Sequence, residues 1–173
     1  MTLANEAEGH DTGSLAARVR ALNRFLSRIP HWFIALLARF SIAAVFWKSG
    51  QTKVEGFEID IIDGRFVLGI PHFGDSTVEL FRDEYKLPLI PPEIAAFLAA
   101  VSEHVFAVLI LIGLATRLSA LALLGMTIVI EVFVYPAAYP VHGVWATVLL
   151  YLIAKGAGIV SVDQALSRNF PAG

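Results

Sequence analysis

Ionisable side chains interrupt the long apolar segments of this chain at a few positions, and chemistry is possible there. Glu131, His142 and Lys48 supply a carboxylate, an imidazole and an ammonium group. If the three meet, histidine or lysine could donate to a ligand carbonyl while the carboxylate shuttles protons. We expect Tyr135 and Trp145 to flank such a ligand, as aromatic rings do in small-molecule sites. A quinone headgroup is one candidate, and anchoring residues at a membrane surface are the plain alternative.

His104 offers a different use of the same groups. Together with Glu131 and His142 it could hold a divalent ion, because imidazole and carboxylate both ligate such metals. It could also carry protons, or it could be a hydrogen-bonded histidine inside a helical bundle. No metal is assigned on this pattern, and no cofactor beyond the candidate quinone.

Arg39 and Glu103 lie deeper in their apolar segments. At 1.5 Å per helical residue, Arg39 lies about 12 Å from one end of its segment and Glu103 about 15 Å from the opposite end of the next. Similar depths predict a charge-assisted pair near the middle of the bilayer. Such a pair could simply lock two helices together. With His104, it could instead form the polar pathway of a small transporter.

Composition indicates what kind of chain positions these groups. Of the 173 residues, 57% are hydrophobic and 16% are charged, and the mean hydropathy is +0.69. Soluble domains carry about 25% charged residues, so a membrane protein is expected. The absence of cysteine excludes disulfides, iron–sulfur clusters and thiol redox chemistry. A net charge of −2 gives no reason to expect nucleic-acid binding.

The hydropathy pattern predicts an all-α membrane protein, a bundle of four transmembrane helices. Apolar segments long enough to cross a bilayer lie at about 31–50, 93–114, 118–135 and 142–159. Residues 51–92 are too polar to span. Within them Asp63-Gly64 predicts a β-hairpin, and a short helix is expected from Asp75 or Ser76 to about Lys86.

The flanking segments indicate orientation. Residues 1–30 form an arm in which, from Ser14, an arginine-rich amphipathic helix is expected at the membrane surface. Residues 31–165 form the membrane domain and 166–173 a short tail. Basic residues gather on the side of this arm, which predicts that both termini are cytoplasmic and that 51–92 is a periplasmic insertion.

Three stretches resemble the DoxX family of small four-span bacterial membrane proteins, over roughly residues 30–165. They are Arg39–Gly50 with Lys53, Glu103 leading into Gly113–Leu118, and Gly158–Asp163. The resemblance implies an inner-membrane protein in contact with the bilayer and with a partner protein or further copies of itself. The family name comes from a small subunit associated with quinol oxidase or thiosulfate:quinone oxidoreductase activity.

Three functions remain open from the sequence. The first is a non-catalytic or accessory membrane subunit in an oxidative, quinone or metal stress response. The second is a quinone-interacting subunit of a membrane oxidoreductase, and the third is a small-molecule or ion transporter. Without cysteine or an evident haem or nucleotide motif, the chain has no evident electron donor of its own. This weakens the case for an isolated enzyme.

Overall fold

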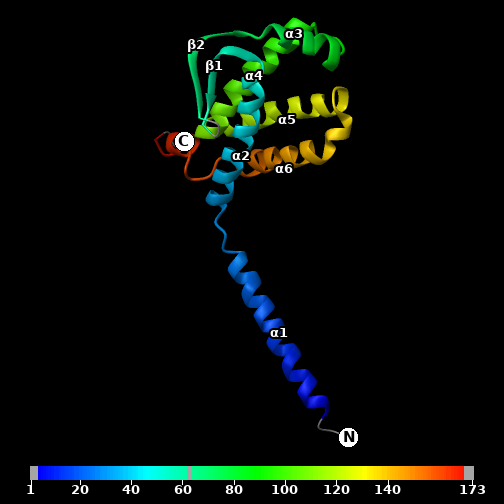
Figure 1. Cartoon of the computed structure of the whole chain (residues 1–173). Coiled ribbons are helices and arrows are strands. Elements are labelled where there is room, and N and C mark those ends of the chain that lie inside the picture. Colours follow the sequence, from blue (N-terminus) through cyan, green and yellow to red (C-terminus); the bar gives the residue numbers. More distant parts are fainter. Residues whose placement is uncertain (1–3, 62–63, 170–173) are drawn as a thin grey trace.

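The computed structural model describes residues 4–61 and 64–169, with side chains from Leu15 onward apart from that of Asp75. Figure 1 shows a helical bundle with a hairpin at one end and a long N-terminal helix that projects from the other. The elements in order are α1 Ala4–Leu26, α2 His31–Gln51, β1 Val54–Asp60, β2 Arg65–Phe73, α3 Asp75–Leu80, η1 Phe81–Tyr85, α4 Pro92–Ile112, α5 Thr116–Phe133, η2 Pro136–Ala138, α6 Tyr139–Lys155 and α7 Val162–Asn169.

The predicted four-helix membrane fold is confirmed. Within the described residues, four helical segments are long and apolar enough to cross a membrane: α2 (21 residues), α4 (21), α5 (18) and η2 with α6 (20). Their outward faces carry large exposed apolar side chains, such as Phe97, Leu118 and Val144. A lipid environment accommodates such faces without further cover.

The last span differs from its predicted bounds of 142–159. Helix α6 begins at Tyr139 and ends at Lys155. The proline at its second position fits the first helical turn, where its missing N–H is not needed. Gly156 ends the helix with a φ of 76°, which residues with a side chain rarely adopt.

The core joins all four spans. Phe46 of α2, Ile110 of α4, Leu123 of α5 and Leu149 of α6 are almost completely buried in one cluster. Helix α2 packs on α4 and α6, and α5 packs on α6 and α4. Small buried residues on the facing surfaces let the helices approach closely, which is how membrane helices gain van der Waals contact. They include Ala35, Ala43, Ala100, Ala107 and Ala120.

The predicted hairpin lies between the first and second spans. Strands β1 and β2 are antiparallel, from Val54 opposite Phe73 to Asp60 opposite Arg65. Asp63 of the predicted turn lies outside the described residues. Trp47 Nε1 donates to the carbonyl of Ile59 at 2.9 Å, so the end of β1 is tied to α2.

Arg39 does not pair with Glu103, and this prediction is wrong. The Arg39 guanidinium is buried and donates to four backbone carbonyls. They belong to Ile110 (2.9 Å), Leu111 (2.6 Å), Ala157 (3.0 Å) and Val160 (2.6 Å). The last carbonyls of a helix lack donors four residues on. Here the arginine fork bonds those of Ile110, which also accepts from the Gly113 N–H, and of Leu111. Glu103 lies seven residues before Ile110, about 10 Å away along the axis of α4.

Asp163 completes this end of the bundle. Its carboxylate accepts from the backbone N–H groups of Ala115 (2.7 Å) and Thr116 (3.0 Å). Its own N–H donates to the carbonyl of Gly113 at 2.8 Å. The carboxylate therefore caps the N-terminus of α5 from a distant part of the chain. Arg39 and Asp163 together fasten the segment after α6 to the turn between α4 and α5.

Candidate functional site

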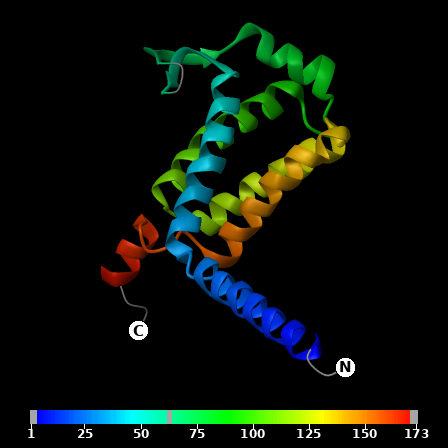
Figure 2. The same cartoon turned by 60° about the horizontal axis from the view of Figure 1, so that its bottom comes forward.

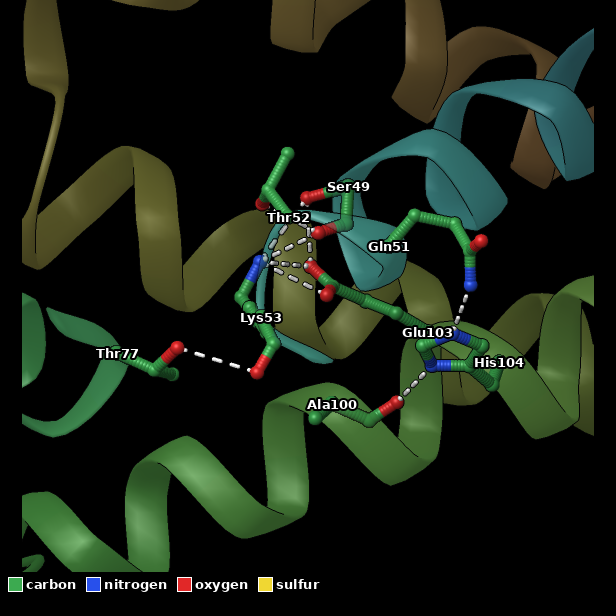
Figure 3. A network of polar contacts seen from close by, with 8 residues as sticks. All are labelled: Ser49, Gln51, Thr52, Lys53, Thr77, Ala100, Glu103 and His104. Carbon is green, nitrogen blue, oxygen red and sulfur yellow. Dashed lines mark hydrogen bonds and ion pairs between the residues drawn. The ribbon is translucent and has the colours of Figure 1, made fainter. Parts of the chain in front are cut away.

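A buried ion pair lies at the end of the bundle that carries the hairpin. Lys53 Nζ is 2.8 Å from Glu103 Oε2 and 3.1 Å from Oε1. The two residues are only 5% and 2% exposed. Ser49 Oγ donates a hydrogen bond to Glu103 Oε1 at 2.8 Å and accepts one from Lys53 Nζ at 3.2 Å. Figure 3 shows the carboxylate enclosed between the lysine and the end of α2.

Lys53 is a site residue that the sequence singled out only as part of the family resemblance. It lies in the turn between α2 and β1, and its side chain returns along the helix to the carbonyl of Ser49, 3.1 Å away. The spacing of four residues from Ser49 was the available signal, since residues so spaced share a helix face. Thr77 Oγ1 donates to the Lys53 carbonyl at 3.1 Å, so α3 helps to hold this turn.

Glu103 also lines a cavity of about 220 Å³ between α2, α4, α5 and η1. Within the described residues the partner of its Oε2 is Lys53 Nζ, at 2.8 Å. The rest of the lining is mostly apolar and includes Leu98, Met126 and Ile130. Small-molecule sites usually measure about 300–1,000 Å³, so this cavity fits a ring-sized group rather than a whole large ligand.

Aromatic residues close this cavity from the hairpin side. Phe81 and Tyr85 of η1 lie in its wall, with ring centroids 4.6 Å apart. The Tyr85 ring meets that of Tyr135 edge to face at 5.7 Å. The Tyr135 hydroxyl donates to Glu84, and this bond raises the pKa of Tyr135 well above its usual value. The end of α5 is thereby fastened to η1.

His104 belongs to a separate hydrogen-bonded network between α4 and α2. Its Nδ1 lies 2.7 Å from the Ala100 carbonyl, which can only accept, so this nitrogen carries the proton. Nε2 then accepts from the Gln51 amide at 2.8 Å, and the Gln51 oxygen receives the Ile59 N–H at 2.7 Å. His104 thus joins α4 to α2 and the hairpin.

Of the five residues predicted to form one ligand site, three come together. His142 Nδ1 is 2.6 Å from Glu131 Oε2, and the His142 ring lies 4.9 Å from that of Trp145. Lys48 is elsewhere, 3.6 Å from Asp60 on the hairpin. Tyr135 contacts η1, as described above.

The position of Lys48 follows from helix geometry. Phe46 faces Trp145, with ring centroids 5.8 Å apart. Lys48 is two residues further on, about 200° round the helix, and therefore on the opposite side. His104 likewise belongs to another cluster than Glu131 and His142. No group of three or more metal-ligating residues occurs in the part of the chain that the structure describes, so the proposed three-residue metal site does not form there.

Comparisons with known proteins agree with this architecture. The family model described as DoxX matches residues 34–136, which covers α2 through α5. A Haemophilus influenzae protein that carries the description "Uncharacterized protein" is 29% identical over 149 residues. That match covers 79% of this chain and 85% of the relative. No solved structure matches the chain.

Gly50 supplies a test of how tightly α2 and α4 meet beside the ion pair. A Cβ at Gly50 would lie 2.8 Å from the His104 ring and 3.2 Å from Glu103 Cβ. We expect Gly50→Ala to lower the free energy of unfolding by about 1–3 kcal/mol, the usual effect of overpacking. Unfolding in one detergent, followed by circular dichroism, measures this change.

Gly125→Ala is the matched control. Nothing lies within 4 Å of a Cβ at this α5 position, so the free energy of unfolding should stay the same or rise slightly. Equal losses in the two variants would contradict close packing of α2 and α4 at Gly50.

Proposed function

This chain belongs to the DoxX family, and we propose that it acts as an accessory, non-catalytic membrane subunit that binds a small ligand beside Lys53 and Glu103. The observation that carries this proposal is a buried ion pair, Lys53 with Glu103, in the wall of an otherwise apolar cavity. Each carboxylate oxygen can accept two hydrogen bonds, and within the described residues Lys53 is the partner of Oε2, so one acceptor position remains. A ligand that brings its own donor would use it.

The chemistry of the site selects the ligand. An ionised carboxylate only accepts hydrogen bonds. The three hydrogens of Lys53 Nζ already face Ser49 and Glu103. The cavity therefore suits a headgroup that brings its own donor, namely a hydroxyl on an apolar, ring-sized body. Phe81 and Tyr85 supply aromatic surface beside it.

A quinone-interacting subunit of a membrane oxidoreductase is the second candidate. The aromatic wall and the acceptor oxygen favour the reduced, hydroxyl-bearing quinol over the quinone. The redox centre would then reside on a partner protein. A transport pathway has less support, because Arg39, Glu103 and His104 belong to three separate networks. The link to oxidative, quinone or metal stress rests on the family resemblance.

We further propose an inner-membrane location with both termini in the cytoplasm. Helices α1 and α7 lie at the end of the bundle opposite the hairpin (Figure 2). Residues 1–30 would be a cytoplasmic arm, 31–165 the membrane domain, 51–92 a periplasmic insertion and 166–173 a cytoplasmic tail. Basic side chains at the α1 and α7 end support this orientation, because cytoplasmic loops carry an excess of lysine and arginine. They include Arg18, Arg24, Arg28, Arg117, Lys155 and Arg168.

A reporter fused after Gly173 tests the orientation. We expect a fluorescent protein that folds only in the cytoplasm to be bright and an alkaline phosphatase that needs the periplasm to be inactive. An active phosphatase fused at this position would overturn the proposed topology.

Ligand binding can be tested on the unaltered protein in nanodiscs. We expect saturable binding of a short-chain quinol by calorimetry, and at least tenfold weaker binding of its dimethyl ether. The ether keeps the ring but lacks the donor, and a hydrogen bond to a charged group contributes about 1.5–3 kcal/mol. Equal binding of the quinol and its ether would contradict a role for Glu103 as acceptor.

A cavity-filling variant tests whether the quinol binds in the cavity beside Glu103. Ala99 lines the same cavity, so Ala99→Phe should abolish quinol binding while the protein remains folded. Glu131→Gln, which alters the separate Glu131–His142 pair, serves as the control and should bind normally. Unchanged binding by Ala99→Phe would place the ligand elsewhere.

A further inference from the structure

A second cavity, of about 540 Å³, lies at the end of the bundle opposite the hairpin. Three basic residues from three different spans line it: His31 begins α2, Arg117 lies at the start of α5, and Lys155 ends α6. Since each marks the end of a span, the three lie near one membrane surface. The cavity therefore opens at the level of the lipid headgroups.

The two cationic residues of this cavity have no partner among the residues that the structure describes. Arg117 and Lys155 are exposed and make no ion pair or hydrogen bond within residues 4–61 and 64–169. The Arg117 guanidinium lies beside Gly156, about 3.5 Å from where a Cβ would stand. It therefore extends from α5 toward the end of α6, where Lys155 is the preceding residue.

The acidic residue in the wall makes no ion pair with these cations among the described residues. Asp163 lines the cavity, but both of its carboxylate oxygens already accept from the N-terminus of α5, at Ala115 and Thr116. His31 is held in place by Tyr151, whose hydroxyl lies 2.6 Å from His31 Nδ1. The site thus presents two unpaired positive charges beside a positioned imidazole.

We propose that this cavity binds the phosphate of an anionic phospholipid. Basic pockets between span ends on the cytoplasmic side are suited to such headgroups. Leu118, which lines the cavity and is 70% exposed, follows Arg117 on the outer surface of α5. It gives the acyl chains of the same lipid an apolar surface directly beside the cationic site.

Helix α1 adds to the positive charge at this end. Its apolar side chains Leu15, Val19, Leu22 and Leu26 form one stripe, all about half exposed or more. Arg20 and Arg24 lie on the opposite face, as their spacing along the helix requires. A helix of this pattern binds anionic membrane surfaces, so α1 would favour the same lipids around the cavity without forming it.

Native mass spectrometry of the full-length protein in detergent tests this site. Phosphatidylglycerol and phosphatidylcholine are added in turn, and the apparent affinity of the first adduct is measured. We expect tighter binding of phosphatidylglycerol. Arg117→Gln with Lys155→Gln should weaken that binding about 25-fold, since each basic residue near the surface contributes about fivefold.

The matched control is Arg20→Gln with Arg24→Gln, which removes the same charge from α1 and should leave the first adduct unchanged. If the double cavity variant fails to fold, each single variant, with an expected loss of about fivefold, provides the test. Equal binding of the two lipids, or an equal loss in the α1 control, would overturn the proposal. Displacement of phosphatidylglycerol by millimolar glycerol 3-phosphate would also overturn it, because a soluble phosphate would then be the ligand.

Discussion

A charge inside a bilayer must find its partners within the protein, because the hydrocarbon offers none. This fold meets the requirement twice, at opposite ends of the bundle. At one end Arg39 donates to carbonyls at the end of α4 and in the segment after α6. At the other, Lys53 neutralises Glu103. The first network uses only backbone acceptors and fastens the connections between spans, whereas the second contains a carboxylate that also meets a cavity.

The two networks therefore differ in role: that of Arg39 is structural, and that of Glu103 is the one we propose to bind a ligand. Four of the five N–H donors of the Arg39 guanidinium bond backbone carbonyls, so this group is committed to holding the connections between spans together. Glu103 is different, because its carboxylate lies in the wall of a cavity. A buried ion pair such as Lys53 with Glu103 contributes little to stability compared with well-packed apolar residues. The proposed ligand would give this pair a role that stability alone does not.

The fold was largely predictable because apolar length and turn chemistry are local properties of a sequence. The contact between Glu131 and His142 was predictable for a similar reason, since the short connection from α5 to α6 keeps their ends together. The predicted Arg39–Glu103 pair was wrong, although the two residues had similar estimated depths in the membrane. In the structure Arg39 bonds the end of α4, about 10 Å along that helix from Glu103. The pairing of Lys53 with Glu103 was not predicted, because it depends on the turn after α2, which directs the Lys53 side chain back along that helix. Lys48 was misplaced because depth alone does not define which face of a helix a residue occupies.

Lys53 and Glu103 act as one buried unit, and a double-mutant cycle measures this most directly. Lys53→Met and Glu103→Leu are made singly and together, and the free energy of unfolding is measured in one detergent. We predict that each single variant loses about 3–5 kcal/mol, because it strands a buried charge, and that the double variant recovers most of this loss. Losses that add to within about 0.5 kcal/mol would show that the two residues do not interact, and would contradict the account.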